Sequence, residues 1–204
     1  MTGRDEALRQ RAQRLAWLIV VWDIIEGAIA VTAGLAAGSI ALLGFGIDSV
    51  IEVFAAAVVI WQLRAGPRAR QRPALQLIAV SFLALAGYVT YKSASDLIGA
   101  ERPDTSLVGI GLNVVALAVM IPVAVAQRRT GRALDNPAVT AQSQETWVSN
   151  YLSVSLLVGL GLNATLDWWW ADPSAALVVA GVAAKAGIDA WREAHEYPQQ
   201  EQRR

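Results

Sequence analysis

Two pairs of acidic residues interrupt the first two apolar stretches of this 204-residue chain. Asp23 and Glu26 lie three positions apart, and Asp48 and Glu52 lie four apart. At helical spacing, each pair projects from one face of its helix, and we expect all four side chains to face the interior of a bundle. A carboxylate inside a bilayer costs about 2.5–3.5 kcal/mol on insertion scales, so such residues mark candidate functional sites. Paired carboxylates repel in low dielectric, and a bound metal ion or exchanging protons would relieve that repulsion.

A purely structural role is the alternative for each of these acids. No Lys or Arg lies inside the first two apolar stretches, so those stretches offer no base for an ion pair. Asp23 and Glu26 each remain open to a role as neutral, hydrogen-bonded acids. Asp48 and Glu52 are two neighbouring carboxylates with no base beside them in the sequence. Packing alone does not explain such a pair, and the sequence therefore favours a ligand role for it.

A second cluster of oxygen donors opens the fifth apolar stretch. Its members are Gln142, Glu145, Thr146, Ser149 and Asn150. Beside Asp48 and Glu52, the side chain of Asn150 with Thr146, Glu145 or water would complete a shell of roughly four to six oxygens for a divalent cation. The alternative is that these are ordinary polar residues at the interfacial start of a span.

The remaining polar residues offer little other chemistry. The chain has no Cys, which removes disulfides and thiolate sites, and its only histidine, His195, cannot build a His-based zinc site. We expect His195 to be a solvated residue near a helix end, with a regulatory metal role as the alternative. Asn113 and Asn163, inside apolar stretches, are expected to bridge helices. No nucleophilic triad, phosphate-binding loop or dinucleotide fingerprint is present, so we expect no enzyme activity.

The elements that position these side chains are predicted to be six membrane-spanning helices. Hydrophobic residues make up 55% of the chain and charged residues 17%, a composition unlike that of an ordinary soluble enzyme. Apolar stretches that can cross about 30 Å of hydrocarbon lie at 16–37, 40–63, 75–91, 107–126, 148–166 and 171–186. The third and the sixth are short, and one of them is open to being tilted, extended or misassigned. The predicted fold class is an all-α membrane protein, a bundle of six transmembrane helices.

The distribution of basic residues predicts the orientation. Lys92 and Arg102 lie between the third and fourth stretches, and the turns at 37–39 and 167–172 carry no base. The segments on the other side contain Arg4, Arg9, Arg11, Arg14, Arg64, Arg68, Arg70, Arg72, Arg128, Arg129, Arg132, Arg192, Arg203 and Arg204. This bias predicts that both termini are cytoplasmic. The chain then divides into an N-terminal segment at 1–14, a six-helix transmembrane domain at 15–190 and a short cytoplasmic tail at 191–204.

Glycines at short spacing predict close contacts between the helices. They are Gly34 with Gly38, Gly44 with Gly46, Gly109 with Gly111, and Gly159 with Gly161. In lipid, such residues allow helix backbones to approach.

Residues 38–52, which lead through a small-residue turn to Asp48 and Glu52, resemble the second-helix motif of the cation diffusion facilitator (cation efflux) family. In that motif two metal-binding acids, or a His and an acid, lie four positions apart. Residues 168–176, with Asp172 followed by Pro173, are similar to the family's outer loop and the start of its sixth helix. The likeness covers about residues 10 to 190, and the chain most resembles the short branch that lacks the C-terminal cytoplasmic domain.

This resemblance implies a six-helix transporter, usually a homodimer, that exports divalent metal from the cytosol in exchange for protons. Asp48 and Glu52 match the helix-two ligands. Thr146 and Asn150 fall where the family usually has a His or Asp and an Asp, which is a departure from the pattern. At most two carboxylates then remain in the site unless Glu145, or Asp23 and Glu26, contribute.

Asp23 and Glu26 are expected to serve proton coupling or another accessory role in the same site. The expected partners are the lipid bilayer, a divalent cation, protons and a second copy of the chain, with no nucleic acid, since 17 basic residues balance 17 acidic ones. Manganese, zinc, cobalt and iron all remain open as the cation. The expected location is a bacterial plasma membrane.

Two rival functions stay open. The first is a non-transporting membrane protein that acts as a structural or regulatory partner and whose metal site has decayed, which the neutral residues Thr146 and Asn150 favour. The second is an intramembrane enzyme that uses Asp48 and Glu52 as an acid and base pair. The second has little support, because the sequence offers no group to bind a lipid phosphate in the same plane.

Overall fold

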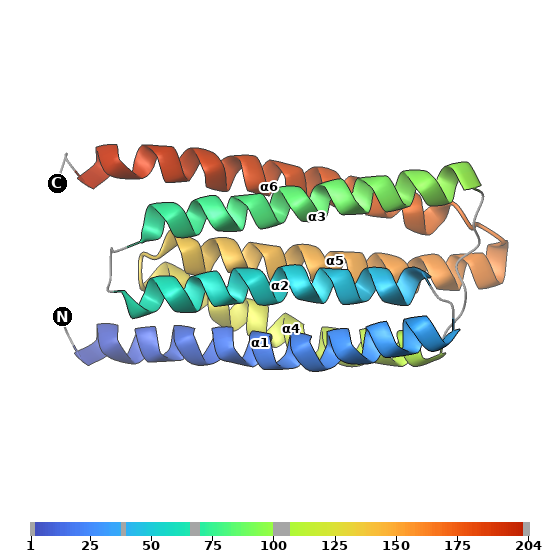
Figure 1. Cartoon of the computed structure of the whole chain (residues 1–204), viewed down its shortest axis with the longest axis horizontal. Coiled ribbons are helices and arrows are strands. Elements are labelled where there is room, and N and C mark those ends of the chain that lie inside the picture. The colour runs from blue at the N-terminus through green and yellow to red at the C-terminus, as the bar shows by residue number, and fades with distance from the viewer. Residues whose placement is uncertain (1–2, 38–39, 66–69, 100–106, 202–204) are drawn as a thin grey trace.

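The computed structural model describes residues 3–37, 40–65, 70–99 and 107–201, and these form six α-helices. In chain order they are α1 (Gly3–Ala37), α2 (Ile40–Arg64), α3 (Gln71–Gly99), α4 (Leu107–Ala133), α5 (Pro137–Leu166) and α6 (Ala171–Glu201). The helices run side by side along one axis and alternate in direction, as Figure 1 shows. We call the end where α1 begins and α6 ends the terminal end.

The predicted helical membrane bundle is confirmed, because one helix covers each of the six apolar stretches. The third stretch, which is short in the sequence, belongs to a helix of 29 residues. Among the described residues, five helices are long and apolar enough to cross a membrane, and α5 is not one of these five. With 30 residues α5 is long enough to span the hydrocarbon, but its first half carries the polar run from Gln142 to Asn150.

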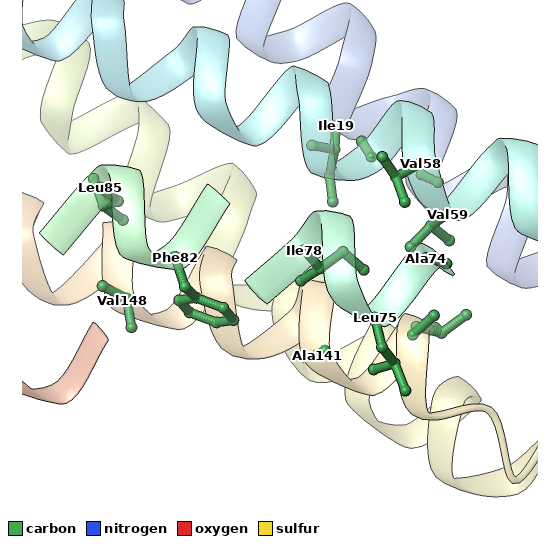
Figure 2. Packing of buried hydrophobic residues seen from close by; sticks show 14 of the residues in the cluster. Ile19, Val58, Val59, Ala74, Leu75, Ile78, Phe82, Leu85, Ala141 and Val148 are labelled. Atoms are coloured by element: carbon green, nitrogen blue, oxygen red, sulfur yellow. The ribbon is translucent and has the colours of Figure 1, made fainter. Parts of the chain in front are cut away.

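Helix α5 has more neighbouring helices than any other helix of the bundle. It packs against α2, α3, α4 and α6, while α1 lies against α2 and α4, and α3 lies along α6. Figure 2 shows apolar side chains of α1, α2, α3 and α5 meeting in one cluster, with Ile19, Val59, Ile78, Phe82 and Val148 among them. Protein therefore shields most polar side chains in the first half of α5, and the buried ones are Gln142, Ser143, Glu145, Thr146, Ser149 and Asn150.

Close contact between α1 and α2 depends on glycines. A Cβ added at Gly27 would lie 3.2 Å from the Cβ of Ser49, and one at Gly34 would lie 3.0 Å from the backbone nitrogen of Leu43. A Cβ at Gly46 would meet Val31 at 2.5 Å. This interface brings the acids of the first two helices to neighbouring positions.

The predicted role of glycines holds for only some of the pairs. Gly34, Gly44 and Gly46 face neighbouring helices, and Gly44 faces the hydroxyl of Tyr88 on α3. The prediction is wrong for Gly111 and Gly161, since a Cβ at either would meet no atom of the described residues within 4 Å. Spacing alone does not say which face of a helix meets a neighbour. Gly38 lies outside the described residues.

A tight turn joins α4 to α5 and fixes the start of α5. Asp135 adopts a left-handed backbone conformation with φ of 48°, and the backbone N–H of Asn136 donates to the carbonyl of Gly131 at 3.0 Å. The side-chain oxygen of Asn136 then accepts a hydrogen bond from the N–H of Val139 at 3.2 Å, which caps the new helix. Local hydrogen bonding thus positions the polar first half of α5 against α2.

Candidate metal centre

Five acidic side chains are buried in the interior of the bundle, as predicted for the four on the first two helices. Asp23 and Glu26 come from α1, Asp48 and Glu52 from α2, and Glu145 from α5, and each exposes between 1% and 8% of its surface. We call these five residues the carboxylate cluster. They lie close enough to repel one another: Asp23 with Asp48 and Glu145, and Glu52 with the other four.

Direct contact between α2 and α5 is made by a serine and an aspartate. The Oγ of Ser149 donates a hydrogen bond to Oδ2 of Asp48 at 2.5 Å, and both side chains are buried. Ser149 belongs to the polar run predicted at the start of the fifth stretch. The structure therefore brings that run together with the acids of the second helix.

Many carboxylate oxygens of the cluster have no partner within the part of the chain that the structure describes. Both oxygens of Asp23, both of Glu145, Oδ1 of Asp48 and Oε1 of Glu52 are buried without a hydrogen bond. None of the five acids forms an ion pair with a described Lys or Arg. Buried carboxylates without donors or bases are costly, and a cation or a proton is what would satisfy them.

The two neutral residues expected on the fifth helix have different surroundings. The hydroxyl of Thr146 donates to the backbone carbonyl of Gln142 at 3.3 Å, which leaves its oxygen able to act as a ligand as well. Asn150 is buried, and its Nδ2 has no hydrogen-bond partner among the residues that the structure describes. Within the described residues, no three carboxylate or imidazole side chains converge as a ready-made metal site. The acids are neighbours that repel, and neutral oxygens lie among them.

The sequence did not single out the side chains that α3 adds to the site. Ser81 is buried beside Glu145, and Tyr88 is half-buried and near Asp48. Both are ordinary polar residues within an apolar helix. Only the packing of α3 against α2 and α5 reveals their role.

Two further expectations concern polar residues outside the cluster. The Nδ2 of Asn113 donates to the carbonyl of Gly109 at 3.0 Å, within its own helix, so the expected bridge between helices is wrong for this amide. The side chain of Asn163 lies outside the described residues. His195 is exposed on α6, where Nδ1 lies 2.8 Å from the carbonyl of Trp191, consistent with a helix-end residue.

Comparisons with known proteins agree with this architecture. Residues 76–196, more than half of the chain, match the family described as the cation efflux transmembrane domain. The chain is also 29% identical over 165 residues to an uncharacterized transporter of Synechocystis sp.. That alignment covers 75% of this chain and 51% of the relative, so the chain spans about half the length of the curated relative it matches.

The family match begins inside α3 and therefore includes Glu145, Thr146 and Asn150 but not the acids of α1 and α2. The matched helices and the apolar spans together identify a protein that crosses the bilayer several times. This chain belongs to the cation efflux family and is a multi-pass integral membrane protein.

Proposed function

We propose that this protein exports a divalent metal cation from the cytosol in exchange for protons. The observation that carries the proposal is the contact between Ser149 and Asp48, which joins α2 and α5 beside buried carboxylate oxygens that have no partner. Membership of the cation efflux family and the likeness to a transporter support the same function.

In this proposal Asp48 and Glu52 supply the charged ligands. Thr146, Ser149 and Asn150 add neutral oxygens from α5, and water completes the shell. Hard oxygen donors suit divalent ions such as Mn²⁺, but ligand type alone does not decide between manganese, zinc, cobalt and iron. Glu145 lies near Asp48, adds negative charge to this site and is a further candidate ligand.

Proton coupling follows from competition for the same oxygens. A hydrated cation that enters from the cytoplasmic side displaces protons from Asp48 and Glu52. After the bundle opens outward, protons from the outer side return to the carboxylates and release the cation. Asp23 and Glu26 on α1 add negative charge next to these groups and serve as accessory proton carriers. A second copy of the chain completes the proposed homodimer.

The experiment is metal flux in proteoliposomes across a panel of divalent ions, with internal pH recorded. Wild-type protein is expected to move at least one ion with protons in the opposite direction, and Asp48→Asn is expected to abolish both fluxes. Asp189→Asn is the matched control, because Asp189 is an exposed acid on α6 that pairs with Lys185 at 2.8 Å. Unchanged coupled flux in Asp48→Asn would rule out this site.

A non-transporting role is the second candidate, and the neutral ligands Thr146 and Asn150 favour it. A protein of that kind would bind partners through the same bundle while moving no ion. Growth of cells with and without the gene on graded divalent metals separates the two functions. A transporter shifts the tolerance to at least one metal, whereas a silent partner shifts none.

A further inference from the structure

Two hydrogen-bonded amide pairs connect helices near the terminal end of the bundle. The Nδ2 of Asn136, at the start of α5, donates to Oε1 of Gln62 on α2 at 3.0 Å. The Nε2 of Gln127 on α4 donates to Oε1 of Gln142 on α5 at 2.7 Å. All four side chains are buried. We call these four residues the amide clasp.

The amide clasp lies between the carboxylate cluster and the terminal end. Gln142 is about one turn of α5 closer to that end than Glu145 and Thr146. Along α2, Gln62 follows Glu52 by about 15 Å of helix. The ends of α2 and α4 and the start of α5 meet at this end of the bundle, as Figure 1 shows. An ion that travelled from there to Asp48 between α2, α4 and α5 would pass the clasp.

Packing around the clasp is tight. The largest fully buried side chains of the described residues include Leu63, Val59 and Val139, next to the clasp in sequence. Farther along α5, beyond the cluster, the side chains of Leu156 and Leu157 are only partly buried. The buried side chains next to the clasp close the bundle at the terminal end, and the amide clasp lies within that closed region. The Oγ of Ser143, next to Gln142 on α5, also donates to the carbonyl of Ala124 on α4 at 3.2 Å.

One amide pair is only half satisfied. Oε1 of Gln127 and Nε2 of Gln142 are buried without a hydrogen-bond partner in the described part of the chain. A static contact would be better served by two apolar side chains, because unmade hydrogen bonds of buried amides cost free energy. An amide carbonyl without a donor is, however, a ligand that a divalent cation accepts in place of water.

We propose that the amide clasp is the cytoplasmic gate of the cation pathway, closed in this structure. This proposal rests on the proposed transport function and on the cytoplasmic orientation of the terminal end. When the bond between Gln127 and Gln142 parts, together with the neighbouring bond from Ser143 to the carbonyl of Ala124, α4 and α5 separate and the carbonyl oxygens of both amides face the opening. These oxygens replace part of the cation's water shell on its way to Asp48, which the apolar neighbours cannot do.

The natural absence of cysteine allows this gate to be tested directly. Ser149→Cys places a single thiol beside Asp48, and a positively charged, membrane-impermeant methanethiosulfonate is applied to full-length protein in inside-out vesicles without metal. Adding Gln127→Ala is expected to raise the labelling rate from the terminal side about fivefold to tenfold, the range that loss of one buried hydrogen bond gives. Labelling from the opposite side should not rise.

Thr130→Ala is the matched control. Thr130 is also buried on α4, three residues from Gln127, but its hydroxyl donates to the carbonyl of Ala126 in the same helix at 2.8 Å. Its loss therefore cuts no link between helices. Gln142→Ala removes the other partner of the bond between Gln127 and Gln142. If one of the two variants fails to fold, the other still tests the gate.

An unchanged terminal-side labelling rate in both amide variants would overturn the gate, as would an equal rise in Thr130→Ala. Labelling does not depend on transport, which keeps the two proposals separable. If Gln127→Ala raises the labelling rate but the protein moves no metal, only the proposed transport function is contradicted. A protein that transports normally but whose labelling ignores Gln127 contradicts the gate alone.

Discussion

Ser149 is the residue through which the two halves of the candidate site touch. Its hydroxyl donates to one oxygen of Asp48, and the other oxygen has no hydrogen-bond partner among the described residues. Hydrogen bonds within membranes average about 0.6 kcal/mol, and those to charged groups are worth about 1.5–3 kcal/mol in proteins generally. The contact therefore stabilises the α2–α5 pairing as well as orienting the carboxylate.

Ser149→Ala should lower the free energy of unfolding by about 1 kcal/mol or more, because Asp48 then loses the buried hydrogen bond from Ser149. A saturating divalent cation should reduce the difference in unfolding free energy between the variant and wild type, since the ion supplies the missing partner of Asp48. Thermal unfolding in detergent with and without metal measures both effects. Ser155→Ala is the control, because the Ser155 hydroxyl on the same helix has no hydrogen-bond partner in the described part of the chain. Equal destabilisation by the two variants would argue against a specific role for Ser149.

Asn150 tests whether α5 belongs to the cation site. Asn150→Asp adds a carboxylate to the neutral side of the site, beside acids that already repel. Without metal the variant should melt at a lower temperature than wild type, and with metal it should show a larger upward shift and at least tenfold tighter binding. Calorimetric titration with the transported ion gives the affinity. Unchanged affinity would place Asn150 outside the ligand set.

At the level of residues, the sequence indicated the buried acids and the polar run on α5 but not the neighbours that α3 contributes. Acids within apolar stretches are visible because nothing else explains their position, and all four are buried. Ser81 and Tyr88 give no such signal, since single serines and tyrosines are common in membrane helices. Only the packing of α3 brings them to Glu145 and Asp48.

Helix α1 can position its acids only because its backbone lies close to α2. Gly34 leaves no room for a side chain, as its Cβ would lie 3.0 Å from the backbone nitrogen of Leu43. Gly111 on α4 faces open space. Both glycines belong to closely spaced pairs in the sequence, but of the two only Gly34 packs against a neighbouring helix.

Gly34→Ala should destabilise the protein by about 1–3 kcal/mol, because α1 must move away from α2. Gly111→Ala should be neutral or stabilising by up to about 1 kcal/mol, since alanine is the better helix former. Unfolding of the two variants under identical detergent conditions makes the comparison. Destabilisation by Gly111→Ala equal to that by Gly34→Ala would contradict the assigned contact between α1 and α2.

At the level of elements, the lengths of the apolar stretches were enough to predict six helices. They did not predict how far the helices extend beyond the apolar part: α1 begins at Gly3 and α6 continues to Glu201. Polar and charged residues at these ends carry no hydrophobic signal, yet they continue the same helices. The polar half of α5 is also understandable only from packing, since α2, α3, α4 and α6 cover it.

For the whole molecule, the alternation of helices places both ends of the described chain at one end of the bundle, as the distribution of arginines requires. Which helices are neighbours was not predictable, because a list of spans does not contain their order in space. That order puts acids from α1, α2 and α5 in one interior. Five acids with no described base then create a negative field that favours cations and protons over any anion.

Equilibrium binding of the divalent cation, with proton release recorded, tests the central claim most directly. We expect binding to wild-type protein to release protons and to weaken as the pH falls, because protons compete for the carboxylates of Asp48 and Glu52. The double variant Asp48→Asn, Glu52→Gln should bind at least a hundredfold more weakly and release no protons. A double variant that binds the ion as tightly as wild type, with the same proton release, would contradict the account.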